Sequence, residues 1–313
     1  MAIHSRILHN GVVREASEPL LLAGQAGLLA GWGVFSTLRV KDGALFAWER
    51  HWARMMRDAR LLSVAMPPDS SAVERSLLQL IRANGRPNCT LRLVVVRNGG
   101  SMWAGPLPEG RVSDVIALTA DSKDWGDSVR LTVQPNGRFA AGEFAAAKIL
   151  SWGANLVWAE RAQQQGFDEV ILLNEHGRVA ECTSANIFAV SGNDVFTPPV
   201  SDGCLPGITR EVLLQELRIP GVRILERGLT IADLEAADEV CITSTTRDLL
   251  PVREIGGKVL GNRRNVRECV TTAFRQFMQQ DIAGRIARFE SGRAEGGRVE
   301  SGKVESGSEA VQV

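Results

Sequence analysis

The chain has 313 residues, 44% of them hydrophobic, which is enough to bury the cores of two ordinary domains. Lys plus Arg and Asp plus Glu both number 36, so no net charge draws the chain to nucleic acid or to a membrane. A small neutral or zwitterionic molecule is the expected partner.

Cysteine usage and the first residues indicate the compartment. The five cysteines are odd in number and include no CxxC pair, a pattern typical of reduced thiols rather than of disulfides or a zinc site. We therefore expect no metal. The start, MAIHSRILHNG, lacks the apolar core of a signal peptide, and no apolar run is long enough to cross a bilayer. We expect a cytoplasmic protein.

The first part of the chain, up to residue 121, predicts a meander of strands with two helices. Alternating apolar residues and turn signals mark the strands, and an apolar stripe marks each helix. The predicted strands are 3–8, 12–13, 33–40, 44–48, 91–96 and 112–120, and the predicted helices are 49–62 and 71–83. Polar and turn residues at 122–127 (SKDWGD) then predict an interdomain linker.

Residues 128–282 predict a second domain of alternating strands and helices. The predicted strands are 129–133, 169–173, 186–190 and 239–243, and the predicted helices are 155–165, 208–217, 231–236 and 265–280. From residue 283 the chain repeats ESGR, ESGK and ESGS with almost no large apolar side chain. We expect residues 283–313 to be a disordered low-complexity tail.

Two charged residues in the second domain stand out from their surroundings. Lys148 follows three alanines and precedes Ile149 and Leu150. Burial of such a segment lowers the pKa of the ammonium, which makes lysine a nucleophile toward carbonyls. Glu181 stands in ECTS, which we place on the connection before strand 186–190. Taken alone, a lysine of this kind is more often one whose ammonium snorkels to solvent, and such a glutamate is more often solvated. The other motifs must therefore decide whether Lys148 and Glu181 are functional.

Two further stretches offer anion-binding groups. Gly207 comes immediately before helix 208–217, so the free N–H groups of Ile208 and Thr209 lie at the positive end of the helix dipole and suit a phosphate. The stretch ITSTTRD ends a strand in consecutive polar residues, at a location that binding sites in α/β proteins favour.

In this order the motifs resemble the fold-type IV pyridoxal-phosphate enzymes, the family of branched-chain and D-amino-acid aminotransferases and of 4-amino-4-deoxychorismate lyase. The resemblance runs from about Gly31 to Val252 and rests on GVFSTLR, ERHWAR, AAKILSWGANLVWAERA, FDEVILLNEHGRVAECTSANIF, LPGITR and ITSTTRDLLPV. Several motifs in a fixed order are more specific than any one. The resemblance implies a two-domain α+β (α/β) fold with a small N-terminal α+β domain and a larger C-terminal pseudo-barrel domain. It also implies a homodimer whose subunits complete each other's pockets.

The resemblance further implies the roles of individual residues. Lys148 would hold pyridoxal 5′-phosphate as an internal aldimine and shuttle a proton, and Glu181 would pair with the pyridine nitrogen. The phosphate would be held by Arg54, Gly207, Ile208, Thr209, Ser244 and Thr245. The substrate pocket would be lined by Phe35, Thr37, Arg39, Arg92, Trp152, Thr245 and Thr246. Arg39 and Arg92 are candidates for a second carboxylate, or alternatively exposed residues in ion pairs.

The chain departs from the family at several positions. It contains no tyrosine, and Trp152 stands where many relatives have one. An indole N–H donates but neither accepts nor ionises, which puts any tyrosine-dependent proton step in question. Ser36-Thr37 and Glu181-Cys182 look more like the lyase branch.

The expected activity is a class IV aminotransferase that moves an amino group between a small, branched-chain-like amino acid and a 2-oxo acid. One alternative is 4-amino-4-deoxychorismate lyase, which releases pyruvate and 4-aminobenzoate. A second is a non-catalytic α/β metabolite-binding protein, although such a carrier would not need both Lys148 and Glu181.

Overall fold

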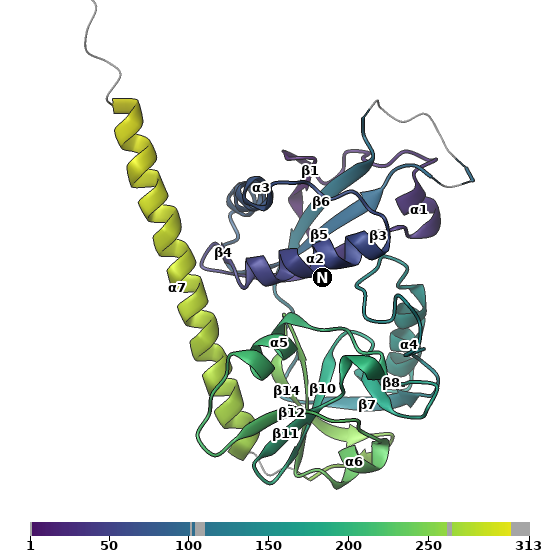
Figure 1. Ribbon diagram of the computed structural model, residues 1–313. Helices are drawn as coiled ribbons and strands as arrows, with labels where there is room; N and C mark the ends of the chain where they lie inside the picture. Colours follow the sequence, from purple (N-terminus) through teal and green to yellow (C-terminus); the bar gives the residue numbers. More distant parts are fainter. Residues whose placement is uncertain (1, 101, 104–109, 262–264, 302–313) are drawn as a thin grey trace, which may run out of the picture.

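A computed structural model describes residues 2–100, 102–103, 110–261 and 265–301. These residues form two β-sheets, each with its own helices, stacked one above the other (Figure 1). Residues 3–120 supply the first sheet and residues 129–259 supply the second. Residues 121–128, between the two sheets, form neither helix nor strand.

The first sheet is entirely antiparallel, with the order β2-β1-β6-β5-β3-β4. Its strands are β1 (Ile3–His9), β2 (Val12–Glu15), β3 (Gly33–Lys41), β4 (Ala44–Leu45), β5 (Cys89–Arg97) and β6 (Ser113–Ala120), and its helices are α1 (Ala26–Ala30), α2 (Trp48–Leu61) and α3 (Ser70–Asn84). One face packs on α2 and α3 through alternate strand residues such as Leu38 and Leu91. The other face therefore carries Phe35, Thr37 and Arg92.

The second sheet is mixed and has the order β12-β11-β10-β13-β14-β7-β8-β9, with β15 paired to β14. Its strands are β7 (Val129–Gln134), β8 (Glu169–Leu173), β9 (Val179–Cys182), β10 (Asn186–Ser191), β11 (Asp194–Thr197), β12 (Arg223–Glu226), β13 (Glu239–Ser244), β14 (Asp248–Ile255) and β15 (Lys258–Val259). Its helices include α4 (Gly153–Gln164), the 3₁₀ turn η1 (Val200–Asp202), α5 (Ile208–Gln215) and α6 (Ile231–Ala236). The sheet curls, because Val179 on β9 and Ile187 on β10 belong to one buried cluster although their strands lie far apart in the strand order.

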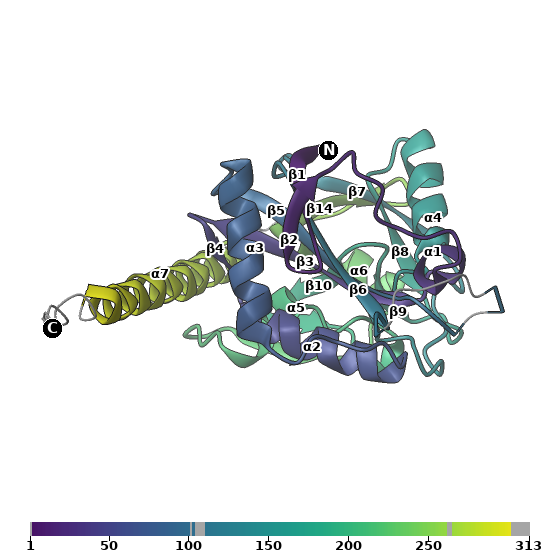
Figure 2. The ribbon, with the colours of Figure 1, turned by 90° about the horizontal axis from the view of Figure 1, so that it is seen from above.

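The last helix, α7 (Asn265–Ser301), runs alongside both domains (Figures 1 and 2). The expectation of disorder from residue 283 is wrong for the first residues of the predicted tail, which belong to α7. Ile282, Ile286 and Phe289 continue the apolar stripe at helical spacing, and Phe289 packs against the core of the small domain. The remainder of the predicted tail, residues 302–313, lies outside the described residues.

Arg285 ties α7 to the small domain. Its side chain is only 3% exposed and pairs with three carboxylates: Asp281 at 2.9 Å, Glu74 of α3 at 3.4 Å, and Glu49 of α2. Asp281 also accepts the backbone N–H of Ala47, at the start of α2, at 2.9 Å. A helix that begins in the large domain thus holds two helices of the small one.

Two truncations test which part of the C-terminal region contributes to stability. Deleting residues 284–313 removes Arg285 and Phe289 and leaves Glu49, Glu74 and Asp281 without their common partner. We expect the free energy of unfolding to fall by about 2–4 kcal/mol, with a clear drop in melting temperature. Deleting only residues 302–313 is the control and should leave the melting temperature unchanged. Equal melting temperatures for the two truncated proteins would contradict a structural role for this end of α7.

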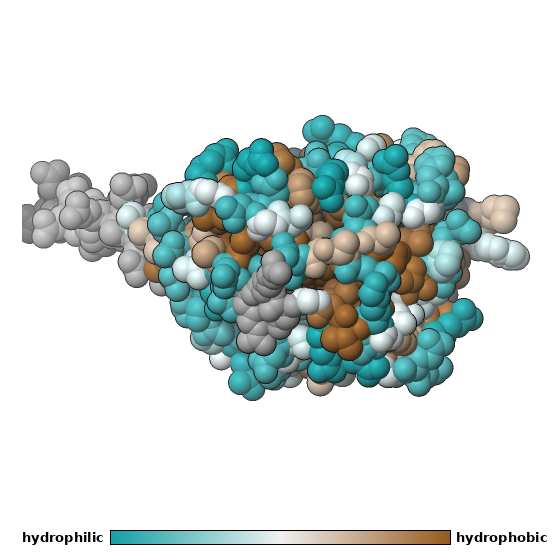
Figure 3. Space-filling view, turned by 90° about the horizontal axis from the view of Figure 1, so that it is seen from below, coloured by the Kyte–Doolittle hydropathy of each residue, from teal (hydrophilic) through white to brown (hydrophobic). Residues whose placement is uncertain are grey.

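None of the helices in the described part of the chain has the length and apolar composition that a bilayer span requires. On the face of the large domain that points away from the small domain, apolar side chains are interrupted by hydrophilic ones (Figure 3). That face therefore carries no uniform apolar belt.

Candidate active site

Lys148 lies on the connection between β7 and α4, where the chain returns to the edge of the small domain. The Phe35 N–H donates to the Lys148 carbonyl at 3.1 Å, and the Leu150 N–H donates to the Gly33 carbonyl at 3.0 Å. The Lys148 N–H donates in turn to Asp58 Oδ2 at 3.0 Å. The backbone that carries the lysine is thus fixed between β3 and α2, at the junction of the two domains.

The Lys148 side chain is partly buried, and its ammonium faces one aromatic ring. Its Nζ lies 4.6 Å from the centroid of the Phe35 ring, which packs edge-on against Trp152 at 6.3 Å. Burial, together with the nearby charge of Arg54, lowers the pKa of Lys148 to about 7, while Glu181 acts in the opposite direction. An amine with this pKa is partly neutral at physiological pH and can attack a carbonyl.

Glu181 lies on strand β9 rather than on the connection where the sequence placed it, because Val179–Cys182 pairs with β8. Its side chain is buried and accepts hydrogen bonds from Arg138 Nη2 at 2.7 Å, Arg138 Nε at 3.1 Å and the Leu205 N–H at 3.1 Å. These three hydrogen bonds hold the carboxylate in one orientation. The sequence analysis missed Arg138, whose turn-rich segment shows no periodic pattern.

Arg54 is a buried cation with an unused hydrogen-bond donor. It donates to Ser36 Oγ at 3.0 Å and to the Pro206 carbonyl at 3.4 Å, whereas its Nε has no hydrogen-bond partner among the residues that the structure describes. Burial lowers the pKa of Arg54 to about 10. Ser36 Oγ also lies 2.7 Å from Nδ1 of His51, a fully buried residue whose pKa burial lowers well below its usual value.

The N-terminus of α5 faces the same region. Gly207 is its N-cap, and a Cβ there would collide with the side-chain oxygen of Asn186, so only glycine fits. The buried hydroxyl of Thr209 has no partner, and the first N–H groups of a helix have none within the helix. Together with Arg54 Nε, these donors form a cradle for an oxyanion such as phosphate.

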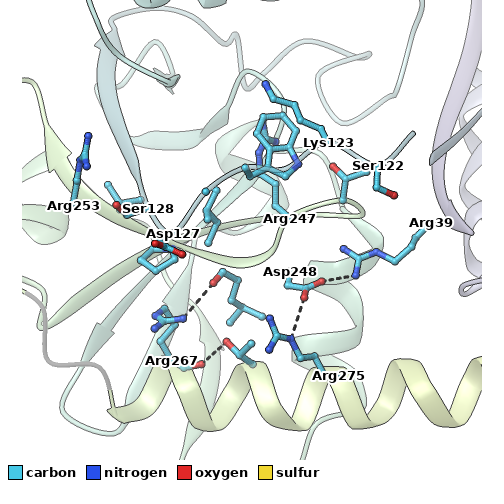
Figure 4. Close-up of a pocket in the computed structure, with 18 of the residues that line it drawn as sticks. Arg39, Ser122, Lys123, Asp127, Ser128, Arg247, Asp248, Arg253, Arg267 and Arg275 are labelled. Carbon is cyan, nitrogen blue, oxygen red and sulfur yellow. Dashed lines mark hydrogen bonds and ion pairs between the residues drawn. The ribbon is translucent and has the colours of Figure 1, made fainter. Parts of the chain in front are cut away.

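The turn after β13 carries Ser244, Thr245 and Thr246, and one of the predicted substrate residues holds it. Arg39 Nε donates to the Thr245 carbonyl at 2.9 Å, and Arg39 Nη1 pairs with Asp248 at 2.7 Å (Figure 4). The guanidinium of Arg39 is therefore committed to the turn and to Asp248. These contacts favour the alternative that Arg39 is a residue in an ion pair, and its role toward a substrate carboxylate stays a prediction.

Arg92 is placed differently. It lies opposite Thr37 in the β3–β5 register, and its guanidinium carbon is 4.7 Å from the centroid of the Phe35 ring, the same ring that Lys148 faces. Burial lowers the pKa of Arg92. Within the described residues it has no carboxylate partner. The structure thus brings Phe35, Trp152 and Arg92 to Lys148, and leaves Arg39 outside this group.

Comparison with known proteins agrees with this arrangement. The profile of the family Amino-transferase class IV matches residues 33–255, which is most of the chain. The chain belongs to the class IV aminotransferases. It is 31% identical over 261 residues to a putative branched-chain-amino-acid aminotransferase of Methanocaldococcus jannaschii, with 83% of this chain and 91% of the relative covered. It is 29% identical to the D-alanine aminotransferase of Bacillus licheniformis, with 82% and 90% covered.

The fold agrees as well. The crystal structure of a branched-chain aminotransferase from Thermoproteus uzoniensis with norvaline superposes with a TM-score of 0.79 at 25% identity, covering 89% of this chain and 96% of that one. The predicted fold-type IV architecture is therefore confirmed. This class IV aminotransferase is a pyridoxal-phosphate-dependent transaminase. The unpartnered buried donors of Arg54 and Thr209, the oriented carboxylate of Glu181 and the low-pKa amine of Lys148 fit the phosphate, pyridine nitrogen and aldehyde of that cofactor.

The pKa of Lys148 leads to a test in this class IV aminotransferase. The rate at which cofactor-free protein captures pyridoxal phosphate should rise with pH through an inflection near 7, because only the neutral amine reacts. An ordinary lysine would give its inflection near about 10.4. Arg92→Leu removes a neighbouring cation and should move the inflection upward, whereas the exposed variant Arg218→Leu should not. A profile insensitive to Arg92→Leu would contradict this electrostatic account.

The same pKa affects stability. The pKa of Lys148 is lower in the folded chain than in the unfolded chain, so protonation of this lysine favours the unfolded state. The resulting destabilisation is largest below pH 7 and disappears as the pH rises toward about 10.4. Stability conferred by the remainder of the fold must therefore hold Lys148 in place.

Proposed function

We propose that Lys148 binds the cofactor covalently and carries the proton that moves between substrate and cofactor. The observation that carries this proposal is the position of one low-pKa amine at the domain junction, close enough to Arg54 and Glu181 for both charges to act on its pKa. Pyridoxal phosphate supplies the carbonyl and the electron-withdrawing ring on which transamination depends. Glu181 would pair with the ring nitrogen of the bound cofactor, and Arg138 holds the Glu181 carboxylate in place.

The phosphate end of the cofactor is held by Arg54, the start of α5 and the turn after β13. Arg54 supplies a guanidinium with a free Nε, and α5 supplies the N–H groups of Ile208 and Thr209 behind Gly207. Ser244 and Thr245 add the hydroxyl groups of the turn that Arg39 holds. This phosphate contact is the same before and during reaction, so it anchors the cofactor without changing the chemical step.

We propose a small, branched-chain-like amino acid and a 2-oxo acid as the substrates. The Phe35 and Trp152 rings beside Lys148 offer an apolar wall for a hydrocarbon side chain, and Thr37 lies on the same sheet face. Arg92 has an uncommitted guanidinium at that wall and suits a carboxylate. Thr246 lies on the turn next to the phosphate site. The relatives named above act, by their names, on branched-chain amino acids or D-alanine.

We further propose that the enzyme is a homodimer whose subunits complete each other's pockets. Leu28 and Leu29 of α1 and Leu156 and Val157 of α4 are all more than 40% exposed, and Ser151 Oγ donates to the Ala30 carbonyl at 3.1 Å, which brings the two helices together. Such an apolar surface favours a protein partner. Light scattering should give twice the mass of the chain, and Leu28→Glu combined with Leu156→Glu should reduce it.

One experiment tests the activity. Purified enzyme with pyridoxal phosphate is incubated with a panel of L- and D-amino acids plus 2-oxoglutarate, and separately with aminodeoxychorismate. We expect glutamate and the corresponding 2-oxo acid from the branched-chain members, and Arg92→Leu should raise KM more than it lowers kcat. The relatives do not favour the lyase alternative. Formation of 4-aminobenzoate without transamination would establish that alternative instead.

A further inference from the structure

A second cavity, of about 1140 Å³, lies behind the turn that carries Thr245 and Thr246 (Figure 4). Its walls come from the linker, the ends of β3 and β5, strand β14 and helix α7. Thr246 lines it, whereas Lys148, Arg54 and Glu181 do not. The cavity is therefore separate from the cofactor site and shares only the turn with it.

The charged groups on this cavity are strongly unbalanced, although the whole chain is neutral. Seven Lys or Arg residues line it, against the two acids Asp127 and Asp248. Three of the seven, Lys41, Arg247 and Arg267, pair with carboxylates outside the lining, which are Asp42, Glu169 and Glu239. Asp248 is shared by two guanidiniums, those of Arg39 at 2.7 Å and Arg275 at 3.2 Å, so one of these positive charges has no counterpart. Lys123 places its ammonium 4.0 Å from the centroid of the Trp125 ring and has no carboxylate partner in the described part of the chain.

The cavity lining also contains buried N–H donors without an acceptor. Among the described residues, Trp125 Nε1 and Arg247 Nε are buried without a hydrogen-bond partner, and Arg267 Nε has only a 3.7 Å ion pair with Glu239. Arg247 is only 8% exposed; its terminal nitrogens bind Ser184 and Glu169, and its guanidinium stacks 3.6 Å from the centroid of the Trp125 ring. Buried polar groups in proteins are nearly always hydrogen-bonded, and here the missing partners are acceptors. An oxygen-rich anion would supply both the acceptors and the missing negative charge.

We propose that this cavity binds a small oxyanion with at least two negative charges, of the phosphate or polycarboxylate class. Arg275 and Lys123 approach it from opposite sides, one on α7 and one on the linker, and both keep exposed side chains that a diffusing anion reaches. Arg247 and Trp125 offer the buried donors. Charge-assisted hydrogen bonds from guanidinium and ammonium groups provide the attraction.

The test uses holoenzyme in which borohydride has joined pyridoxal phosphate to Lys148, so that the phosphate cradle at Arg54 is already filled. Citrate and inorganic phosphate are titrated separately by calorimetry at constant ionic strength, and sodium chloride controls for screening. We expect one saturable site per chain. Arg275→Gln and Lys123→Gln should each weaken binding about tenfold, the loss of one charge-assisted contact, whereas Arg218→Gln, at an exposed arginine outside the cavity, should not.

The two titrations also identify the class of anion: tighter binding of citrate indicates a polycarboxylate, and tighter binding of phosphate indicates a phosphate ligand. Binding that Arg275→Gln and Lys123→Gln leave unchanged would overturn the proposal, as would no binding of either anion. A heat signal that sodium chloride reproduces would mean general screening and would also overturn it. Light scattering in the same buffers checks that binding does not change the oligomeric state; a change that accompanied it would assign the cavity to a subunit interface instead.

Discussion

Lys148→Ala should reduce transamination by about four orders of magnitude or more, since it removes both the nucleophile and the group that transfers the proton. The variant should also lose the visible absorbance of the bound cofactor. Its fold should remain intact, because the backbone of this segment is fixed by hydrogen bonds to Phe35, Gly33 and Asp58 that do not involve the side chain. Absorbance spectra and a coupled glutamate assay measure the two effects, and the melting temperature checks the fold.

A matched variant distinguishes the chemistry of Lys148 from its charge. Lys148→Arg keeps a cation at the same position but presents a guanidinium that does not lose its proton near neutral pH. It should be as inactive as Lys148→Ala. Lys258→Ala, at an exposed lysine paired with Glu235, is the control and should retain full activity. Substantial turnover by Lys148→Arg would mean that the residue acts only as a positive charge, and the assignment would fail.

Glu181→Gln should leave the cofactor bound while turnover falls by roughly a hundredfold, because an amide cannot stabilise a protonated ring nitrogen as an anion does. That contact matters most when negative charge develops on the ring during reaction, so kcat should fall more than cofactor affinity. The change also leaves Arg138 without its carboxylate partner. Steady-state kinetics at saturating cofactor measure the effect.

Glu169 provides a closely matched control for Glu181. It lies on the neighbouring strand β8, is similarly buried, and is paired with Arg247 at 3.2 Å. Glu169→Gln should lower stability, because it disturbs a buried network with Ser184 and Arg247, but it should have a much smaller effect on kcat. Equal losses of kcat in the two variants would show that Glu181 acts through stability, and near-normal turnover in Glu181→Gln would remove it from the site.

Local patterns in the sequence were sufficient to predict most elements of the fold and to mark the candidate residues of the site. Apolar periodicity predicted α2 and α3 to within a residue or two, and the Gly207 motif predicted the start of α5 at Ile208. The apolar run around Lys148 predicted an amine with a lowered pKa, and burial at the domain junction lowers the pKa in that direction. These features depend on neighbours within a few residues, which is the range over which a sequence pattern carries information.

Other features depended on contacts between distant segments. Short strands such as β12 have little periodicity of their own and exist because a neighbouring strand pairs with them. Arg138 reaches Glu181 across 43 positions, and Arg39 reaches Asp248 and Thr245 from the other domain, so no local pattern marks either arginine as a partner. The polar ESG repeats predicted a tail, yet Arg285 just before them is ordered by carboxylates of α2 and α3. The sequence determined which residues have the chemistry for this enzyme, and the tertiary structure decided which of those charges remain free, because a charge is neutralised by whatever group the fold places beside it.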